Sequence, residues 1–426
     1  MIQVRPRSLA LTLAATFALV AGCGGATSST PVTTAPATPS NATWDATAKA
    51  ARGTTVNWYL WGGSDAINTF VDTTYGTALK ERYDITLKRV PVADTVDAVN
   101  QVLAEKQAGT ERGAADLIWI NGENFSTLRQ AGMLRTNWAR TLPNAALVNW
   151  DDPALNRDFG VPVDGMESPW SSAQLQLIAD PSRTPMDTLP RSYAAFATWA
   201  CAHPGRATYI APGPGGFVGT RFVKGALYEL TGGAASWQRF DQRQWAAQSS
   251  KLWAYLNELK PCLWRKGATY PRDENEMHAL FANHEIDLSL TQAIAGPATL
   301  VAAGTLPAGV QTFVFDANMI GDFNYVAIPT NAPHPAAALV LANLILDPAM
   351  QAAHVRPESG FGLGPAIDPA RITDAAQRTE FTEALAARGD GATPVTDLQS
   401  SRASDAAPKY QDLIERGWRD NVLRAG

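Results

Sequence analysis

Residues 54–120 carry a repeating pattern of apolar positions that predicts strands and helices in turn. Residues 54–61 are rich in β-branched and aromatic side chains and lie between glycines, which is typical of a buried strand. After them, apolar residues recur at three- and four-residue steps, which indicates a helix with one buried face. Strands are also predicted at 85–90 and 116–120, with a helix between them that Gly109 ends. This alternation is typical of a parallel sheet covered by helices.

In a sheet of this kind, ligands bind beyond the carboxyl ends of the strands. The loops at 62–64 and 121–124 each follow a predicted strand, so we expect both to face one crevice. Ser64 is expected to cap the helix that follows the first loop. The glycine pair of that loop has two explanations: backbone amides presented to an anionic group, or a tight turn.

The rest of the chain has shorter apolar segments and no internal repeat. Residues 199–219 are rich in proline and glycine, which indicates a loop. The predicted strands are 160–163, 174–178, 312–315 and 325–328, and the predicted helices are 221–231, 245–259, 336–346, one starting at Asp347-Pro348, and 411–423.

The N-terminus has the order of segments expected of a lipoprotein signal peptide. Arg5 and Arg7 precede an apolar run at 9–20, which is shorter than the ~20 residues of a membrane-spanning helix. The run ends in Val-Ala-Gly followed by Cys23, small residues leading directly into a cysteine. We therefore expect residues 1–22 to be removed and Cys23 to be lipidated. The mature chain would be anchored on the periplasmic or cell-surface side of the membrane.

Composition and length then indicate the tether, the number of lobes and the class of partner of the mature chain. Residues 24–43 are almost wholly small, Thr and Pro residues without charge, so we expect a flexible tether that occupies residues 23–53. About 370 residues remain, more than one core usually supports, and two lobes are expected. The net charge of −5, without a long basic cluster, argues against nucleic acid as a partner.

Two cysteines remain besides the one at the signal-peptide end. Cys201 and Cys262 are an even number in a compartment that permits oxidation, so we expect them to form a disulfide. The bridge would close a loop of about 60 residues and stabilise the fold by roughly 4 kcal/mol on the chain-entropy model. The alternative is a catalytic thiol, for which His203 is the only histidine close in sequence.

Several long stretches resemble one known family. The stretches are TVNWYLWGGS, DLIWINGENFSTLRQAGML, VPVDGMESPWSSAQL, WAYLNELKPCLWRKGATYP and FNYVAIPTNAPHPAAALVLANLILDPAMQ. They resemble the solute-binding lipoproteins of ABC transporters, and within these the YnjB-type group of the type II periplasmic-binding-protein fold. The resemblance runs from Thr54 to the C-terminus.

The resemblance implies an α/β fold: a two-lobed periplasmic-binding-protein type II clamp with a mainly parallel sheet in each lobe. The chain would cross between lobes near 161–168 and again near 313–326. The expected segments are 54–164 in lobe 1, 165–310 in lobe 2, 311–346 as return crossing and second segment of lobe 1, and 347–426 as C-terminal helices mainly of lobe 2.

It also implies the function. The protein would capture a small polar solute in the cleft between its lobes and deliver it to an ABC permease, as a monomer, without enzymatic activity and without a cofactor. We favour a sugar-like or otherwise hydroxylated solute. The alternatives are a secreted hydrolase or carbohydrate-processing lipoprotein, and a binding lipoprotein that serves a sensor rather than a permease.

Matching the chain to the family's blocks gives three expected ligand-binding loops, at 61–64, 121–124 and 165–170, and the second lobe adds Tyr270 and Thr291, although residues 291–293 depart from the family's Asn-Pro sequence. The expected ligand-binding residues are Trp61, Gly62, Gly63, Ser64, Asn121, Gly122, Glu123, Asn124, Glu167, Trp170, Tyr270 and Thr291. Each of these residues also has a structural interpretation: residues 121–124 are typical of a turn with a helix cap through Asn124, and most tryptophans belong to cores. Residues 213–220 lack the lysine of a phosphate-binding loop, and a turn before a helix is favoured there.

Catalytic and metal chemistry has little support in the sequence. The histidines at 203, 278, 284, 334 and 354 include no pair with the four-residue spacing of a zinc-binding helix, and no metal site is expected. No Gly-x-Ser-x-Gly motif occurs, which weakens the hydrolase alternative.

Overall fold

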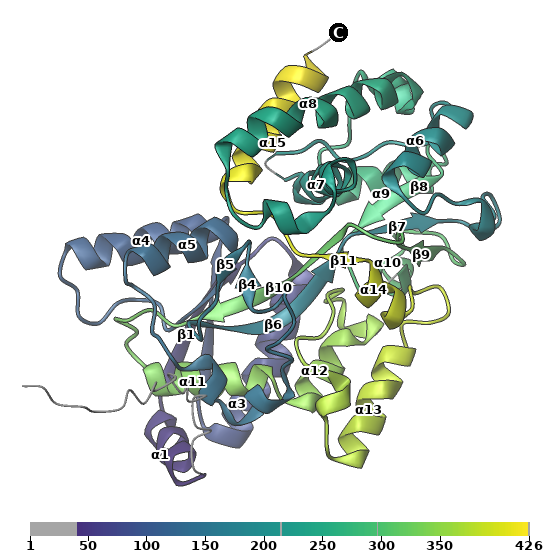
Figure 1. Cartoon of the computed structure of the whole chain (residues 1–426). Helices are drawn as coiled ribbons and strands as arrows, with labels where there is room; N and C mark the ends of the chain where they lie inside the picture. The colour runs from purple at the N-terminus through teal and green to yellow at the C-terminus, as the bar shows by residue number, and fades with distance from the viewer. Residues whose placement is uncertain (1–40, 214, 296, 425–426) are drawn as a thin grey trace, which may run out of the picture. The chain divides into compact units, whose positions relative to one another are not determined.

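The computed structural model describes residues 41–213, 215–295 and 297–424 (Figure 1). The predicted signal peptide, the lipidation site at Cys23 and the tether up to residue 40 lie outside the described residues. From residue 41 the expectation of a tether is wrong, because Asn41–Ala51 forms helix α1. Trp44, Ala48 and Ala51 lie three or four residues apart, so one face of α1 is apolar and packs on the first core.

The larger sheet has six strands and contains the predicted alternation. Strands β1 and β2 are parallel, as are β1 and β3. The order is β11-β10-β3-β1-β2, and β6 also pairs with β10, antiparallel to it. The strands are β1 (Thr55–Trp61), β2 (Thr86–Val92), β3 (Leu117–Ile120), β6 (Glu167–Gln174), β10 (Met319–Ala327) and β11 (Arg402–Ala403).

The smaller sheet belongs to the other half of the chain and has the order β8-β7-β9. Its strands are β7 (Gln176–Ala179), β8 (Leu288–Thr291) and β9 (Gln311–Phe313). Both outer strands are antiparallel to β7, so the expectation of a mainly parallel sheet is wrong for this lobe. The reason is chain direction: β7 continues β6 away from the larger sheet, whereas β9 leads into β10, which returns to it.

Helices cover both faces of the larger sheet (Figure 1). Side chains of α4 and α5 form a core on one face, and those of α2, α3 and α11 form a core on the other. The helices are α1 (Asn41–Ala51), α2 (Asp65–Phe70), α3 (Gly76–Tyr83), α4 (Thr95–Gln107), α5 (Gly122–Gln130), α6 (Tyr193–Ala202), α7 (Phe217–Thr231), α8 (Gln242–Leu259), α9 (Glu274–Ala282), α10 (Pro297–Ala302), α11 (Pro335–Ile345), α12 (Pro348–Val355), α13 (Ala375–Ala386), α14 (Val395–Ser401) and α15 (Lys409–Trp418), with π-helical turns at Val71–Tyr75 and Arg419–Leu423.

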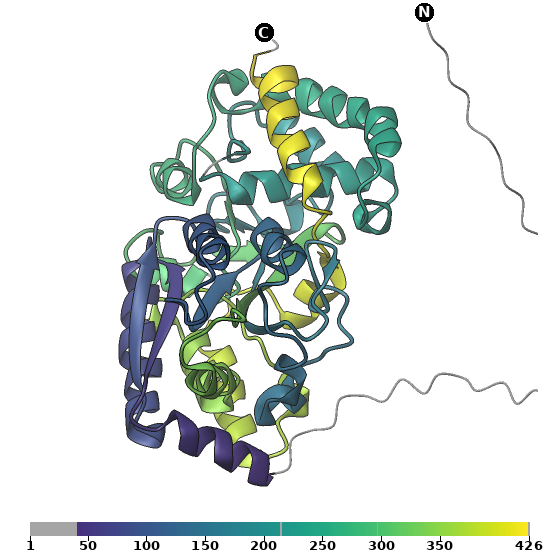
Figure 2. The same cartoon turned by 90° about the vertical axis from the view of Figure 1, so that its left-hand side faces the viewer.

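The buried side chains define two lobes. The first lobe, as we use the term, is built around the larger sheet from residues 51–170 and 323–384. The second lobe is built around the smaller sheet from residues 175–320 and 398–422. Helix α15 packs on α7 at the end of the chain (Figure 2).

The expectation that 347–426 belongs mainly to the second lobe is wrong for α12 and α13. Their apolar residues, among them Val355 and Phe381, lie in the first-lobe core. A second difference lies at 199–219, where a loop is predicted throughout, because α6 extends to Ala202. Its capping residue Ser192 and its buried Phe196 and Trp199 stabilise a helix there.

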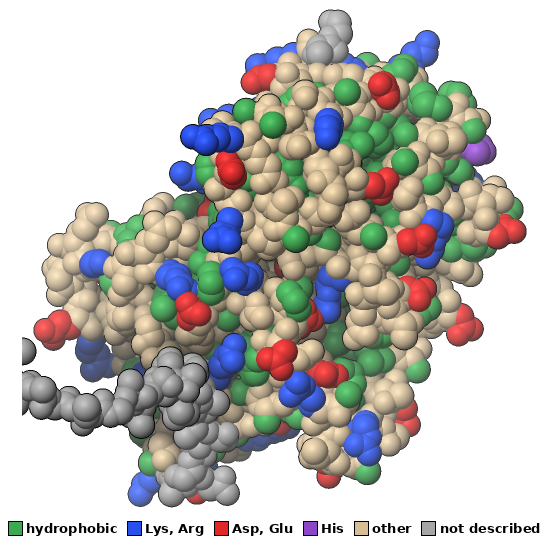
Figure 3. Space-filling model, viewed as in Figure 1, with side chains coloured by type: hydrophobic (Ala, Val, Ile, Leu, Met, Phe, Trp, Pro, Cys, Tyr) green, Lys and Arg blue, Asp and Glu red, His purple; other side chains and the backbone are tan. Residues whose placement is uncertain are grey.

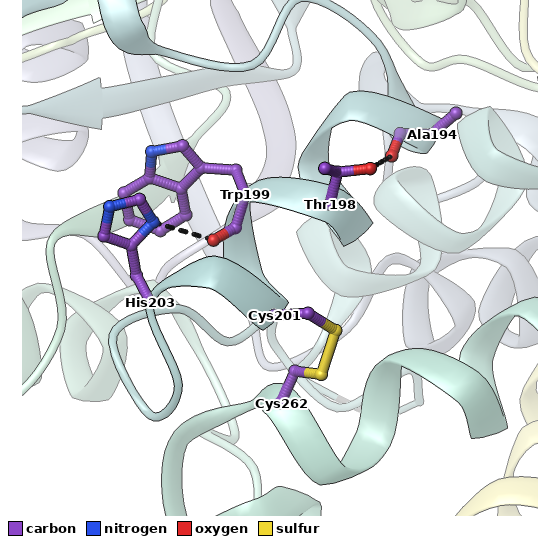
Figure 4. The surroundings of a disulfide bond; sticks show 6 residues. All are labelled: Ala194, Thr198, Trp199, Cys201, His203 and Cys262. Atoms are coloured by element: carbon purple, nitrogen blue, oxygen red, sulfur yellow. Dashed lines mark hydrogen bonds between the residues drawn. A yellow bond between two sulfur atoms is a disulfide. The ribbon is translucent and has the colours of Figure 1, made fainter.

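The predicted disulfide between Cys201 and Cys262 is present. It joins the end of α6 to the turn after α8 (Figure 4). Both cysteines belong to the second lobe, so the bridge is local to that lobe. Nearby, His203 Nδ1 lies 2.8 Å from the carbonyl oxygen of Trp199 and its ring stacks on the indole, which places this histidine in a structural contact.

Among the described helices, none is long and apolar enough to cross a bilayer alone, and the only pair that passes by length and composition is α11 with α12, bent by 61°. On the face seen in Figure 3, acidic and basic side chains are interspersed.

Candidate functional site

The boundary between the lobes lies beyond the carboxyl ends of β1 and β3, where the crevice is predicted. Strands β6 and β10 run side by side across this boundary (Figure 1). The edge of β10 pairs with β3 at Tyr325–Ala327 and with β11 at Met319 and Ile320. The segment between these pairings, residues 321–324, is therefore the part of β10 closest to both lobes.

The loop after β1 is held by its own contacts. The Gly62 amide donates to the carbonyl oxygen of Val92, and the Gly62 carbonyl accepts from the Asn68 side chain. Ser64 caps α2, as predicted, by accepting from the Ile67 amide. A Cβ atom at Gly62 would lie 2.6 Å from Pro91 Cβ. Close packing therefore explains this glycine, and its amide is already bonded to the end of β2.

The loop after β3 contacts the connecting strands directly. Asn121 occupies the N-cap position of α5, so the alternative that Asn124 caps this helix is wrong. The Asn121 side chain donates to the Phe323 carbonyl and accepts from Trp119 Nε1. The same indole N–H lies 3.2 Å from Asn324 Oδ1, and Asn324 donates to Ser171. These bonds fix a polar surface across β3, β10 and β6.

A hairpin formed by β4 (Arg157–Asp158) and β5 (Val161–Pro162) extends from the first lobe to the second. Its turn residues, Phe159 and Gly160, have φ values of 43° and 75°. A left-handed backbone costs a non-glycine residue about 1–2 kcal/mol. The Phe159 ring stacks on Phe217 of α7, with centroids 6.0 Å apart and an interplanar angle of 13°. This contact joins the lobes.

Helix α7 presents two buried cations at the same boundary. Arg221 Nη2 donates to both carboxylate oxygens of Asp322, at 2.6 and 2.5 Å. Lys224 Nζ donates to Asp405 Oδ1 at 2.6 Å, and both of these side chains are 1% exposed. We call the two ion pairs and Asp158 the boundary cluster. The cluster brings together side chains from the first-lobe hairpin, from strand β10, which connects the lobes, and from the second lobe.

Asp158 and Glu167 are buried carboxylates beneath the loop after β3. The Gly122 amide donates to Asp158 Oδ2 at 2.6 Å, whereas Asp158 Oδ1 and both Glu167 oxygens have no hydrogen-bond partner among the described residues. Burial raises the pKa of both groups well above the ordinary value, and in Glu167 the charge of Asp158 adds to the effect. The two carboxyl groups therefore resist simultaneous ionisation.

Comparison with known proteins identifies the family of this chain. Residues 74–383 match the family of bacterial extracellular solute-binding proteins. The chain is also 40% identical to protein YnjB of Escherichia coli K12 over 333 residues, which cover 78% of this chain and 84% of that protein.

The chain is a bacterial extracellular solute-binding protein of the YnjB type.

Solved structures of low sequence identity share the fold of this solute-binding protein. An extracellular solute-binding protein of Bordetella parapertussis has a TM-score of 0.62 at 13% identity, covering 86% of this chain and 98% of that chain. The periplasmic binding protein AfuA of Actinobacillus pleuropneumoniae has a TM-score of 0.55 at 14% identity, covering 87% and 99%. The predicted fold, the type II periplasmic-binding-protein fold, and the predicted family are thus confirmed.

The remaining predicted site residues of this solute-binding protein fall into two groups. Trp61 is 39% exposed and meets Trp119 edge-to-face, with ring centroids 6.4 Å apart. Partial burial raises the pKa of Glu123, and the nearby carboxylates of Asp412 and Glu415 on α15 add to the effect, so this residue faces the second lobe. Both positions are compatible with solute contact.

Three others are buried. Trp170 lies in the first core against Trp58, Trp119 and Phe361. Tyr270 packs between Tyr209 and Trp418, and Thr291 ends β8 and accepts from the Ala293 amide. Their burial favours a structural role for each, and the ligand contacts predicted for them remain predictions. Among the described residues, no group of three or more His, Cys, Asp or Glu side chains is arranged to hold a metal ion.

Sequence reasoning missed the boundary cluster. Arg221 and Lys224 lie three residues apart within the otherwise apolar and small sequence FVGTRFVKGAL. Charged residues on a buried helix face require partners, and this is the signal that identifies them. The partners themselves are 101 and 181 residues away in sequence.

We expect Glu167→Gln to stabilise the protein at pH 8 and to have little effect at pH 4. The folded-state pKa of Glu167 is raised, so the folded protein favours the neutral carboxyl group. The stability that this neutral group contributes is fully present below the unfolded pKa of about 4, and it is lost as the pH rises towards the folded pKa. Glutamine cannot ionise and removes that loss. The melting temperature should rise by about 2 °C or more at pH 8.

The exposed Glu81→Gln variant is the control and should follow the wild-type melting curve at both pH values. A lower melting temperature for Glu167→Gln at pH 8 would instead mean that the ionised carboxylate is stabilised in the folded protein.

Proposed function

We propose that this protein is exported, anchored through lipidated Cys23, and captures a small polar solute between its lobes for delivery to an ABC importer. In this mechanism the solute contacts both lobes at once, and its affinity for the closed state shifts the population towards closure. The permease then recognises the closed state. No covalent chemistry is needed.

The observation that carries the proposal is the boundary cluster. Arg221, Asp322 and Asp158 are buried where the hairpin, β10 and α7 meet. Polar groups are costly to bury in a purely structural lobe contact, because water and hydrogen bonds are lost. Their concentration at the lobe boundary of a solute-binding protein supports a polar solute as the normal occupant of this boundary.

The structural relatives do not select one solute. One is named a spermidine/putrescine ABC transporter protein of Listeria monocytogenes, with a TM-score of 0.55 at 14% identity over 86% of this chain and 98% of that one. AfuA is described with fructose-6-phosphate bound. These solutes differ in charge, so their common property is that they are small and polar.

Small-angle scattering together with thermal unfolding tests the proposal. The full chain, purified in detergent, is incubated separately with sugars, polyols, amines, vitamins and anions. We expect one class to raise the melting temperature and to reduce the radius of gyration, since binding at a hundred times Kd contributes about 2.7 kcal/mol. If no class produces either effect, the capture mechanism is rejected.

Cys23→Ser tests the anchor separately. Without the thiol no lipid can be attached, so we expect the variant to move from the membrane fraction to the soluble fraction of the cell. Fractionation and immunoblotting measure this, and mass spectrometry of the wild-type N-terminal peptide detects the lipid. Cys201→Ser is the control for loss of a cysteine and should stay in the membrane fraction. Equal distribution of Cys23→Ser and wild type would contradict the anchor.

A further inference from the structure

Arg221 is the buried side chain of the boundary cluster with the largest unused hydrogen-bonding capacity. The residue is 2% exposed, and only Nη2 is bonded, to Asp322. Its Nε and Nη1 atoms are buried without a partner among the residues that the structure describes. A buried guanidinium whose N–H groups lack acceptors is strongly unfavourable. These donors therefore require an acceptor that the chain does not supply.

The direction of these donors is constrained by the surroundings of the guanidinium. The ring of Phe217 covers one face of it, 4.5 Å from Cζ to the ring centroid. Asp322 binds the end of the side chain from β10, on the strand segment between the two lobes. Burial raises the pKa of half-buried Glu274, and the charge of Arg221 is close enough to offset part of this rise. Arg221 is thus held at the boundary by elements of both the connecting strand and the second lobe.

Charge balance in the cluster argues against a charged solute group at this point. Arg221 pairs with Asp322 and Lys224 pairs with Asp405, so each buried cation is neutralised by one carboxylate, and burial raises the pKa of the third acid, Asp158, which favours its neutral form. An anionic group beside Arg221 would face Asp322 at close range, and a cationic group would face Arg221 itself. A neutral group avoids both repulsions.

The cluster also contains unused acceptors. Asp158 Oδ1 and Asp405 Oδ2 are buried without a partner among the described residues, as are the Arg221 donors. A hydroxyl group both accepts and donates hydrogen bonds, so adjacent hydroxyls on one molecule satisfy donors and acceptors of this kind together. Exposed Trp61, at the end of β1, adds an aromatic face of the type on which sugar rings pack.

We infer that Arg221 anchors the solute and that the solute is a neutral polyhydroxylated molecule, a sugar or an open-chain polyol, whose hydroxyl oxygens accept hydrogen bonds from Nε and Nη1 of Arg221. This inference rests on the proposed function, because it names the solute class of the same cleft.

The decisive variant is Arg221→Lys. Lysine keeps the positive charge opposite Asp322 but lacks the Nε and Nη1 donors, so folding is preserved while solute bonds are lost. The control is Arg191→Lys, whose side chain pairs with exposed Asp316 on the surface of the second lobe. Wild type and both variants, as full chains in detergent, are titrated with neutral sugars and polyols, with putrescine and spermidine, and with sugar phosphates and carboxylates.

For wild type we expect a thermal shift with at least one neutral sugar or polyol and none with the amines or anions. For Arg221→Lys we expect a Kd for that solute about 10-fold to 100-fold weaker, the range for lost hydrogen bonds to a charged donor. Arg191→Lys should bind as wild type does. Unchanged melting temperature of unliganded Arg221→Lys shows that the loss is not one of folding. If unliganded Arg221→Lys melts at a lower temperature than wild type, a double variant is used in its place. This variant combines Arg221→Gln with Asp322→Asn, so it removes both charges of the pair. It should bind the solute with the same weakened Kd.

The possible outcomes distinguish solute capture in general from the binding of a neutral, hydroxylated solute by Arg221. No shift with any class rejects the proposed function itself. A shift with an amine or an anion alone leaves solute capture standing and overturns the neutral, hydroxylated class. A neutral solute that binds wild type and Arg221→Lys equally overturns the role of Arg221.

Discussion

Lys224→Met is expected to lower the free energy of unfolding by about 3–5 kcal/mol, because it leaves Asp405 as an unpaired buried charge. Both side chains are 1% exposed, and Nζ is 2.6 Å from Asp405 Oδ1. The other oxygen, Oδ2, has no partner among the described residues. Lys224 Nζ also lies 5.1 Å from the ring centroid of Phe159, so the variant loses a cation–π contact between the lobes.

Urea unfolding followed by tryptophan fluorescence measures the loss. Lys80→Met is the matched control, because Lys80 pairs with Asp84 on the surface, where the side chains are 59% and 55% exposed and solvent screens the attraction, so its loss should leave stability almost unchanged. Lys224→Met combined with Asp405→Asn removes both charges and should recover most of the loss. An unfolding midpoint of Lys224→Met equal to that of wild type would contradict the burial of this pair.

Replacing both Cys201 and Cys262 with serine should destabilise the second lobe by roughly 4 kcal/mol. The bridge spans a sequence separation of 61, and a loop of this length loses about that much free energy on the chain-entropy model. Because both cysteines lie in the second lobe, the first lobe should keep its own stability. We therefore expect the second lobe to unfold at lower urea than the first.

Non-reducing mass spectrometry of the exported protein checks the bridge first. Wild type treated with dithiothreitol should then match the double-serine variant in urea unfolding, since both lack the same cross-link. Free thiols at both positions in exported wild type, or a double variant as stable as oxidised wild type, would contradict the prediction.

Local sequence patterns determined much of the first lobe. β1 and its neighbours were predictable because β-branched and aromatic residues fill short segments bounded by turn residues. Helix α1 was missed because Trp44 is a single large apolar residue next to a Pro- and Thr-rich segment. The direction of β8 and β9 and the lobe of α12 and α13 depend on where the chain crosses back, which local periodicity does not encode.

The candidate site was likewise predictable only in part from local sequence patterns. The Asn121 and Glu123 loop was found because strand ends and turn residues are visible in sequence. Arg221 and Asp322 were missed because their relation exists only after α7 packs against β10, 101 residues later. Glu167 was selected as a ligand residue from its position in a motif, whereas its burial beside Asp158 depends on the hairpin fold.

The crossing strands β6 and β10 have a consequence for how the protein is made. β10 pairs with β3 and with β6, so the larger sheet lacks a strand until residues 319–327 are available. A chain that crosses a membrane from its N-terminus delivers this strand only after most of its length. The first lobe therefore cannot complete its sheet until most of the chain has been delivered. For the same reason, neither lobe corresponds to one continuous stretch of the gene, and no simple truncation yields an isolated lobe.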